Sequence, residues 1–109
     1  MISIDSIIQD LREGSVIAPG TLMEYERWCV GEFAWIAGLL KDILVEKATQ
    51  WSEIRKNVSS DNQADQLWAQ TQSGRDEIGY KWELKRLSKL ISTIRRLWEN
   101  AMAEAKSQI

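Results

Sequence analysis

The stretch from Tyr80 to Ala105 carries apolar residues at alternating spacings of three and four, the pattern of a long helix packed lengthwise on another helix. These residues fill positions a and d of successive heptads: Tyr80, Leu84, Leu87, Ile91, Ile94, Trp98, Ala101 and Ala105. Leu90 and Leu97 widen the stripe. The stretch contains no Gly or Pro and is rich in strong helix formers. We therefore predict a long helix over residues 74–106.

A second long helix is predicted over residues 21–57. One of its faces repeats a small or apolar residue every seven positions: Leu22, Cys29, Ile36 and Ile43. Thr21 followed three residues later by Glu24 is a capping-box pattern, which predicts where this helix begins. Gly31 and Gly38 interrupt it, and each costs about 1 kcal/mol relative to Ala. That cost indicates that a neighbouring helix or a Trp ring approaches closely at the two glycines.

A short amphipathic helix is predicted over residues 3–13. Its apolar residues fall on one helix face at spacings of three and four: Ile4, Ile7, Ile8 and Leu11. Ser3 can cap its start, and Gly14 lies where helices commonly end. The residues from Gly14 to Gly20, with the single proline Pro19, are predicted to form a loop.

A second short helix is predicted over residues 61–72, where Ser60 and Gln63 form another capping-box pattern. The residues of this helix that we expect to face inward are Ala64, Leu67, Trp68 and Thr71. Ser73 is expected to cap the last long helix. Asp76 and Glu77 then fall in its first turn, at the positive end of the helix dipole.

These elements predict an all-α fold, a bundle of about four helices in one domain spanning residues 1–109, with the two long helices antiparallel and packed like a coiled coil. A helix of about 35 residues extends about 50 Å. Two short helices cannot cover two apolar stripes of that length. We therefore expect a homodimer, in which the exposed remainder of each stripe pairs across a two-fold axis.

The residue types argue against catalysis. The chain has no histidine, the commonest general base and metal ligand, and no glycine-rich phosphate loop. The single cysteine, Cys29, lies on the apolar stripe and is expected to be buried rather than nucleophilic. Asp42 and Glu46 lie one helical turn apart, but no further ligands accompany them. We expect no enzyme activity, no cofactor and no bound metal.

The sequence is also that of a cytoplasmic protein. A single cysteine excludes an internal disulfide and fits a reducing compartment. The N-terminal residues lack the basic and long apolar regions of a signal peptide. The most apolar segment, from Phe33 to Leu40, is far shorter than the roughly 20 residues that a membrane span needs. We therefore expect no membrane partner.

Six tryptophans are many for a chain of 109 residues. Trp28 and Trp35 are one heptad apart at the edge of the apolar stripe, so they project in the same direction. Tryptophan is enriched among the residues that dominate protein–protein binding. We therefore predict that these two residues contact a protein partner. The remaining tryptophans are expected to fill the core where helices cross: Trp51, Trp68, Trp82 and Trp98.

Charge is unevenly distributed although the net charge is only −2. Residues 1–54 carry nine acids against four bases, and residues 75–96 carry seven bases against three acids. Mutual pairing of an acidic helix with a basic one is the favoured explanation. The alternative is a nucleic-acid contact through the basic face of the last helix, with Trp82 stacking on a base. The residues of that face are Lys81, Lys85, Arg86, Lys89, Arg95 and Arg96.

Part of the chain resembles a known group of proteins. The segment Trp68-Ala69-Gln70-Thr71-Gln72-Ser73-Gly74, followed by Lys85, Leu87, Lys89, Leu90, Ile91-Ser92 and Arg95-Arg96-Leu97, is similar to small helical proteins encoded by tailed bacteriophages. The resemblance covers residues 40–108. It implies a phage origin and a protein that binds and blocks a larger host-defence or DNA-processing machine, an anti-CRISPR protein being one such case. Inhibitors that mimic DNA are strongly acidic, and this chain is not.

The sequence therefore predicts a non-enzymatic, cytoplasmic protein-binding module that is a homodimer and modulates or inhibits a larger protein machine. Two alternatives stay open. The first is an accessory nucleic-acid-binding protein for phage recombination or replication, acting through the basic face. The second is a structural oligomer, such as a component of a virion or a scaffold.

Overall fold

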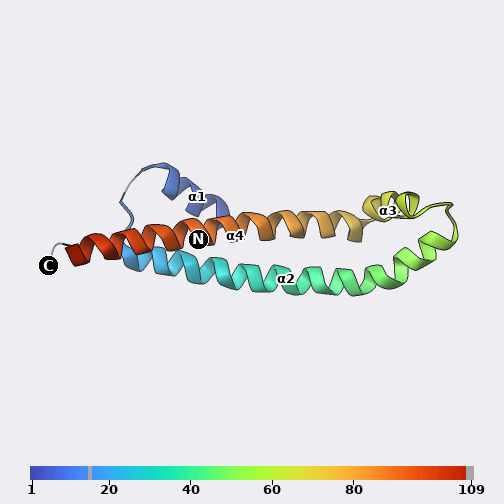
Figure 1. Cartoon of the computed structure of the whole chain (residues 1–109), viewed down its shortest axis with the longest axis horizontal. Coiled ribbons are helices and arrows are strands. Elements are labelled where there is room, and N and C mark those ends of the chain that lie inside the picture. The colour runs from blue at the N-terminus through green and yellow to red at the C-terminus, as the bar shows by residue number, and fades with distance from the viewer. Residues whose placement is uncertain (15, 108–109) are drawn as a thin grey trace. The chain divides into compact units, whose positions relative to one another are not determined.

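The computed structural model describes residues 1–14 and 16–107, and within them it contains helices and no strand (Figure 1). The helices are α1 (Ile4–Arg12), α2 (Pro19–Lys56), α3 (Asp61–Gln70) and α4 (Gln72–Ser107). The long helices α2 and α4 pack against each other, so the predicted all-α fold is confirmed. The chain divides into two compact units, which we describe separately. Unit 1 comprises Met1–Ala34 and Lys85–Ile109, and unit 2 comprises Trp35–Leu84.

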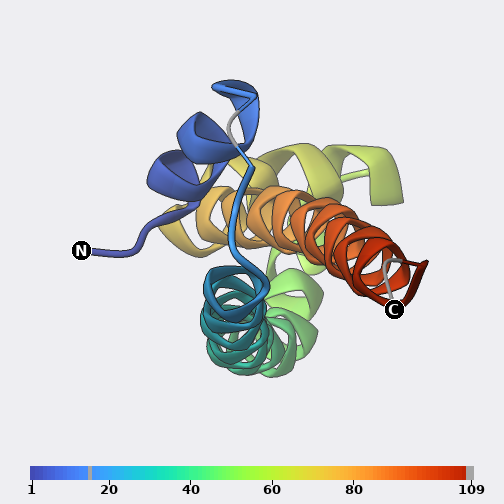
Figure 2. The same cartoon turned by 90° about the vertical axis from the view of Figure 1, so that its left-hand side faces the viewer.

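Unit 1 has an apolar core to which α1, α2 and α4 all contribute. In Figure 2 this unit faces the viewer, with α1 above the paired segments of α2 and α4. Its buried apolar residues are Ile7, Leu22, Cys29, Leu87, Leu90, Ile91 and Ile94. The four residues from α4 belong to the predicted stripe, and the two from α2 belong to the predicted seven-residue repeat. The spacing in the sequence therefore identified the helix faces that meet in this core.

Polar contacts at the surface of unit 1 join acids of the N-terminal half to bases of α4. Arg86 Nη2 lies 3.1 Å from Asp5 Oδ1, and Arg95 Nε lies 2.9 Å from Glu26 Oε1. The Tyr25 hydroxyl donates to the Asp10 carboxylate, which ties α1 to α2. These contacts agree with the predicted pairing of acidic and basic segments. Exposed ion pairs contribute roughly 0–1 kcal/mol each, so the apolar core supplies most of the stability of this unit.

The ends of α1 agree with the prediction. Ser3 caps its start, because the Ser3 hydroxyl accepts from the Ser6 amide at 3.1 Å and the Ser6 hydroxyl accepts from the Ser3 amide at 2.9 Å. A serine thus plays the reciprocal part that glutamate or glutamine usually plays in a capping box. Gly14 follows the C-cap residue Glu13 and has φ +69°, a conformation that glycine adopts without steric cost.

The start of α2 differs from the prediction. The helix begins at Pro19, two residues before the predicted start, so Thr21 lies inside the helix and its capping box with Glu24 is not formed. The Ala18 carbonyl accepts the first helical hydrogen bond, from the Leu22 amide at 3.1 Å. Proline is favoured at the first position of a helix because its fixed φ suits the helix and its missing N–H is not needed there.

A polar turn separates α2, which ends at Lys56, from α3. The Ser60 hydroxyl caps α3 by accepting from the Gln63 amide at 3.2 Å, as predicted. The Gln63 side chain, however, accepts from the amide of Ser59 at 3.0 Å, one residue before the position that a capping box uses.

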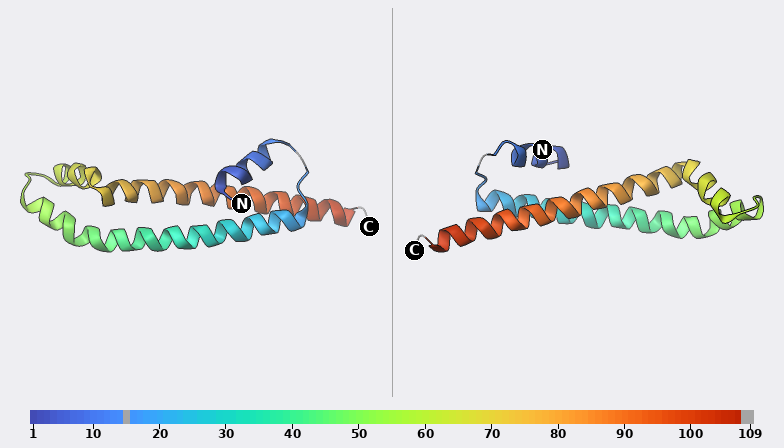
Figure 3. Two further views of the ribbon diagram at one scale, coloured as in Figure 1. Left: turned by 180° about the vertical axis from the view of Figure 1, so that it is seen from behind. Right: turned by 45° about the horizontal axis from the view of Figure 1, so that its top comes forward.

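A single residue, Thr71, separates α3 from α4, whereas the sequence prediction placed the break at Ser73. The Thr71 amide donates to the Trp68 carbonyl at 3.0 Å and so ends α3. Its hydroxyl accepts from the Gly74 amide at 3.0 Å and so caps α4. Figure 3 shows the chain turning after α2, so that α3 leads directly into α4. Thr71 is thus both the C-cap of α3 and the N-cap of α4.

The turn between α3 and α4 also requires a glycine. A Cβ atom on Gly74 would lie 1.9 Å from the carbonyl oxygen of Trp68, which is part of the backbone and cannot easily move. The predicted close approach at Gly31 and Gly38 is wrong within the chain, because a Cβ atom at either position meets nothing within 4 Å. The sequence pattern therefore assigned close packing to the wrong glycines.

Unit 2 has a much smaller apolar core. Among its residues, all of which are described, the buried apolar ones are Ile36, Ala64 and Trp68. Trp51 in this unit and Trp98 in unit 1 are half-buried. The predicted core position of Trp82 is wrong, because its side chain is 64% exposed. Trp82 occupies heptad position f, which faces away from the partner helix.

Leu67 in α3 was also predicted to face inward, and it is exposed. Ala64 and Trp68 are one helical turn apart and form the line along which α3 packs. Leu67 lies about 100° around the helix from Trp68, outside that narrow line.

We predict that Gly74→Ala lowers the free energy of unfolding by about 2–3 kcal/mol, because the added methyl group overlaps backbone atoms that cannot relax without opening the turn. Gly79→Ala is the matched control in the same helix, since a Cβ there meets nothing within 4 Å. We expect the control to raise stability by up to about 1 kcal/mol. Urea unfolding followed by far-ultraviolet circular dichroism measures both. Equal effects of the two substitutions would contradict the assigned close contact.

Candidate protein-binding surface

The part of α2 that belongs to unit 2 carries a shallow apolar groove on its surface. The residues that line it are Ala37, Leu40, Lys41, Leu44, Val45 and Ala48. Their spacings of three and four place them along one side of the helix. Leu44 is 42% exposed and Val45 is 66% exposed. Lys41 is the only charged residue among the described residues that line the groove.

A second hollow continues this groove along α2. It is lined by Leu44, Lys47, Ala48, Trp51 and Asp65, so the two hollows share Leu44 and Ala48. The indole N–H of Trp51 donates to Asp65 Oδ1 at 2.8 Å, which fixes the half-buried ring between α2 and α3. We call the continuous surface the α2 strip, defined by Ala37, Leu40, Lys41, Leu44, Val45, Ala48 and Trp51.

The exposure of the α2 strip follows from the thin core of unit 2. The unit buries three apolar side chains, yet its described residues leave a larger set of large apolar side chains exposed: Trp35, Leu44, Val45, Leu67, Ile78 and Trp82. Single exposed apolar residues are normal, whereas a contiguous apolar surface usually marks a binding site. Leu44 and Val45 belong to such a contiguous surface.

A buried carboxylate, Glu77, is the most unusual electrostatic feature of unit 2. Its side chain is 8% exposed and meets one donor from each helix of the unit. Lys47 of α2 lies 3.1 Å from Oε1, and Lys81 of α4 lies 2.7 Å from Oε2. The indole N–H of Trp68 in α3 donates to Oε1 at 3.0 Å. The Lys47 ammonium also lies 5.8 Å from the centre of the Trp68 ring, in the range of a cation–π contact.

These contacts keep Glu77 charged. Burial acts to raise its pKa, but the hydrogen bonds from Lys81, Lys47 and Trp68 outweigh burial and lower the pKa to about 2. The carboxylate is therefore a permanent acceptor near neutral pH and cannot serve as a general acid there. The sequence placed Glu77 and Asp76 in the first turn of α4. Because α4 begins at Gln72, both lie beyond that turn.

The two predicted interface tryptophans have different environments. Trp28, in unit 1, is half-buried. Trp35, in unit 2, is 64% exposed and is therefore available to a partner, but it does not line the α2 strip. Sequence reasoning did not single out Leu44 and Val45. The sequence did contain one indication of their exposure: Leu44 and Val45 directly follow Ile43, the last member of the seven-residue repeat, and therefore lie beside the face that the repeat predicts to be buried.

The predicted basic face is divided by the structure. Lys81 belongs to unit 2, where it is bound to Glu77, and the other five residues belong to unit 1. Arg86 and Arg95 of that group pair with Asp5 and Glu26. The remaining members of the group, Lys85, Lys89 and Arg96, are exposed.

Cys29 is buried, as predicted. Burial and, to a lesser extent, the nearby Glu32 raise the pKa of its thiol to about 11, so the thiol stays protonated at neutral pH. Within residues 1–14 and 16–107, no group of three or more Cys, Asp or Glu side chains is arranged to hold a metal ion. No helix in that part of the chain is both long and apolar enough to cross a membrane.

We predict that Glu77→Gln lowers the free energy of unfolding by about 2 kcal/mol at pH 7, because Lys47 and Lys81 then face a neutral amide in a buried site. Lys81 is 55% exposed, so water screens part of its contribution. Glu53→Gln is the control. It removes an exposed carboxylate that pairs with Lys56, and we expect a change below about 0.5 kcal/mol.

The effect of Glu77 depends on pH. Its pKa is about 2 in the folded chain and has an ordinary value of 4.5, so the unfolded chain binds the proton more tightly. The stabilising contribution is therefore complete above pH 4.5 and is lost as the pH falls toward 2. Denaturant unfolding across this window should show the wild type and Glu77→Gln converging in stability. A constant difference down to the lowest pH would show that the charge of Glu77 is not responsible.

Comparison of this chain with models of protein families, with curated proteins and with solved structures found no match.

Proposed function

We propose that this chain is a non-enzymatic protein-binding module and that the α2 strip is its contact surface. The observation that supports this proposal is the contiguous exposure of Leu44 and Val45 in a unit that buries only three apolar side chains among its residues. Covering the strip removes apolar surface from water, which contributes about 25 cal/mol for each Å² buried. A bound partner would therefore bury apolar side chains of unit 2 that the unit itself leaves exposed.

The partner element that fits the α2 strip is an amphipathic helix. The strip follows one helix for several turns, and apolar side chains at spacings of three and four on a second helix can pack along it. Lys41 also restricts which charges the partner helix can carry. It stands in the wall of the apolar groove, and the described residues provide no carboxylate within ion-pair distance of it. We infer that the partner helix carries a carboxylate beside its apolar face, opposite Lys41.

The resemblance to small phage proteins supplies the class of target. We propose that the partner helix belongs to a host-defence or DNA-processing machine in the bacterial cytoplasm and that occupancy of this helix modulates or inhibits the machine, as an anti-CRISPR protein does. The accessory nucleic-acid-binding alternative has less support, because Lys81, Arg86 and Arg95 already pair with carboxylates. The other possible protein partner is a second copy of this chain, and the experiment below distinguishes it from a host protein.

A photo-crosslinking amino acid in place of Val45, in the chain produced in bacterial cells, tests the proposal. We expect a crosslink to a second protein, mapped by mass spectrometry to a helical peptide with a carboxylate next to apolar residues. The same amino acid at Thr49 is the control, since Thr49 is exposed on α2 but does not line the strip. We expect no product there.

Binding of the purified crosslinked protein then measures the contribution of each group. Val45→Asp and Lys41→Glu should each weaken binding about tenfold or more, while Thr49→Asp changes it little. Equal crosslinking at both positions, or at neither, would contradict the α2 strip as the contact surface. A crosslink from Val45 to a second copy of the chain would replace the proposed target by a homodimer.

A further inference from the structure

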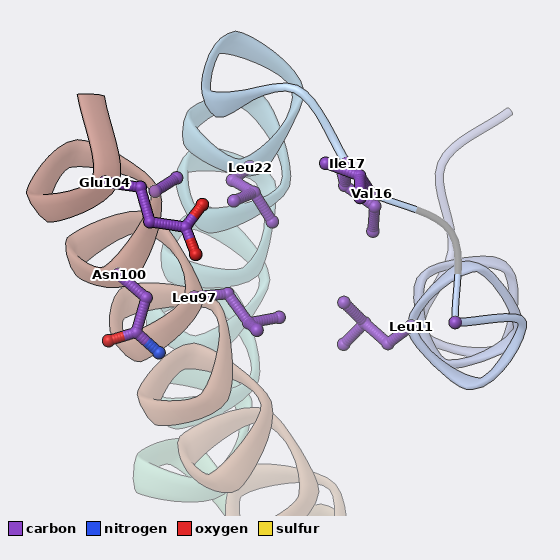
Figure 4. Close-up of a pocket in the computed structure, with 9 residues that line it drawn as sticks. Leu11, Val16, Ile17, Leu22, Leu97, Asn100 and Glu104 are labelled. Carbon is purple, nitrogen blue, oxygen red and sulfur yellow. The ribbon is translucent and has the colours of Figure 1, made fainter. Parts of the chain in front are cut away.

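A cavity of about 380 Å³ opens in unit 1, where the ends of three elements meet (Figure 4). Its lining comes from α1 and the residues after it, from the start of α2, and from the end of α4. This volume falls in the range of about 300–1,000 Å³ that is usual for small-molecule sites. The cavity is open to solvent on one side, so a ligand can enter it.

One side of the cavity is apolar. Leu11 of α1 and Leu97 of α4 point toward one another across it in Figure 4, and Leu22 of α2 points into the space between them. Ile17 lies on the same side as Leu11, in the segment that connects α1 to α2. These branched side chains can surround a short hydrocarbon group and remove it from water.

The other side of the cavity is polar and comes from α4. Glu104 directs its carboxylate inward from α4, and Asn100 lies one helical turn before it (Figure 4). The described residues offer no cation within ion-pair distance of the Glu104 carboxylate. A carboxylate without a cationic neighbour can accept hydrogen bonds from an ammonium group, and the Asn100 amide is directed away from the Glu104 carboxylate in Figure 4.

We propose that this cavity is a binding site for small amphipathic amines, with the hydrocarbon group between Leu11, Leu22 and Leu97 and the ammonium group at Glu104. The two sides of the cavity fix the orientation of the ligand. A neutral alcohol of the same length fills the apolar side without the ion pair, and a carboxylate of the same length places a like charge beside Glu104. The order of affinity is therefore amine, alcohol, carboxylate.

The test is a titration of the full-length, nitrogen-15-labelled chain with octylamine, octanol and octanoate, each below the concentration at which it forms micelles. Backbone amide shifts at Ile17, Leu97 and Glu104 report binding at the cavity. We expect all three probes to shift these amides and octylamine to bind most tightly.

Glu104→Gln should weaken octylamine binding about threefold to fivefold, as expected for a partly exposed ion pair, and should remove its advantage over octanol. Glu99→Gln is the control on the same helix, because Glu99 is exposed and does not line the cavity. Leu97→Asn should weaken all three probes, since it replaces an apolar side chain of the cavity wall by a polar amide of nearly the same size, and Leu97 is partly exposed rather than part of the core.

Two results would overturn the proposal. Shifts spread over the chain, or none at the cavity amides, would show that the cavity binds no such ligand. Binding at the cavity with the same affinity order in wild type and Glu104→Gln would show that Glu104 does not select the ammonium group.

Discussion

A helix can bury only the stripe of side chains that faces another helix, and this constraint governs both units of the chain. In unit 1, α1 lies on α2 and α4, so the core receives residues from three helices and buries Leu87 and Ile94 completely. In unit 2, the third helix is α3, which is short and packs along a line of two residues, Ala64 and Trp68. The flank of α2 that carries Leu44 and Val45 is consequently left uncovered.

The polar cluster around Glu77 compensates in part for the small apolar core of unit 2. Burying a carboxylate is costly unless several donors satisfy it, and here each helix of unit 2 provides one: Lys47, Trp68 and Lys81. Hydrogen bonds and ion pairs require particular distances and directions, whereas apolar contacts do not. The cluster therefore restricts the relative positions of the three helical segments of unit 2 more tightly than three buried apolar residues could. The requirement for Gly74 acts in the same direction, because it fixes the turn that places Trp68 beside Glu77.

Sequence spacing identified the buried faces of the long helices because burial depends on a periodicity that many residues share. Leu22, Cys29 and Ile36 form the buried line of α2 as predicted. The helix starts were less predictable. At Thr71 and Pro19 a boundary depends on one or two hydrogen bonds, and alternatives such as Ser73 or Thr21 differ little in energy.

The candidate sites depend on contacts that no local pattern contains. The environment of Glu77 is set by Lys47, 30 positions earlier in the chain, so its sequence neighbours indicate only an acid near a helix start. The exposure of Leu44 depends on how far α3 extends beside α2, and the cavity near Glu104 depends on where α1 ends. In each unit, therefore, the surface available for binding lies where a short helix stops covering a long one. Helix length, more than residue type, determines where these two sites occur.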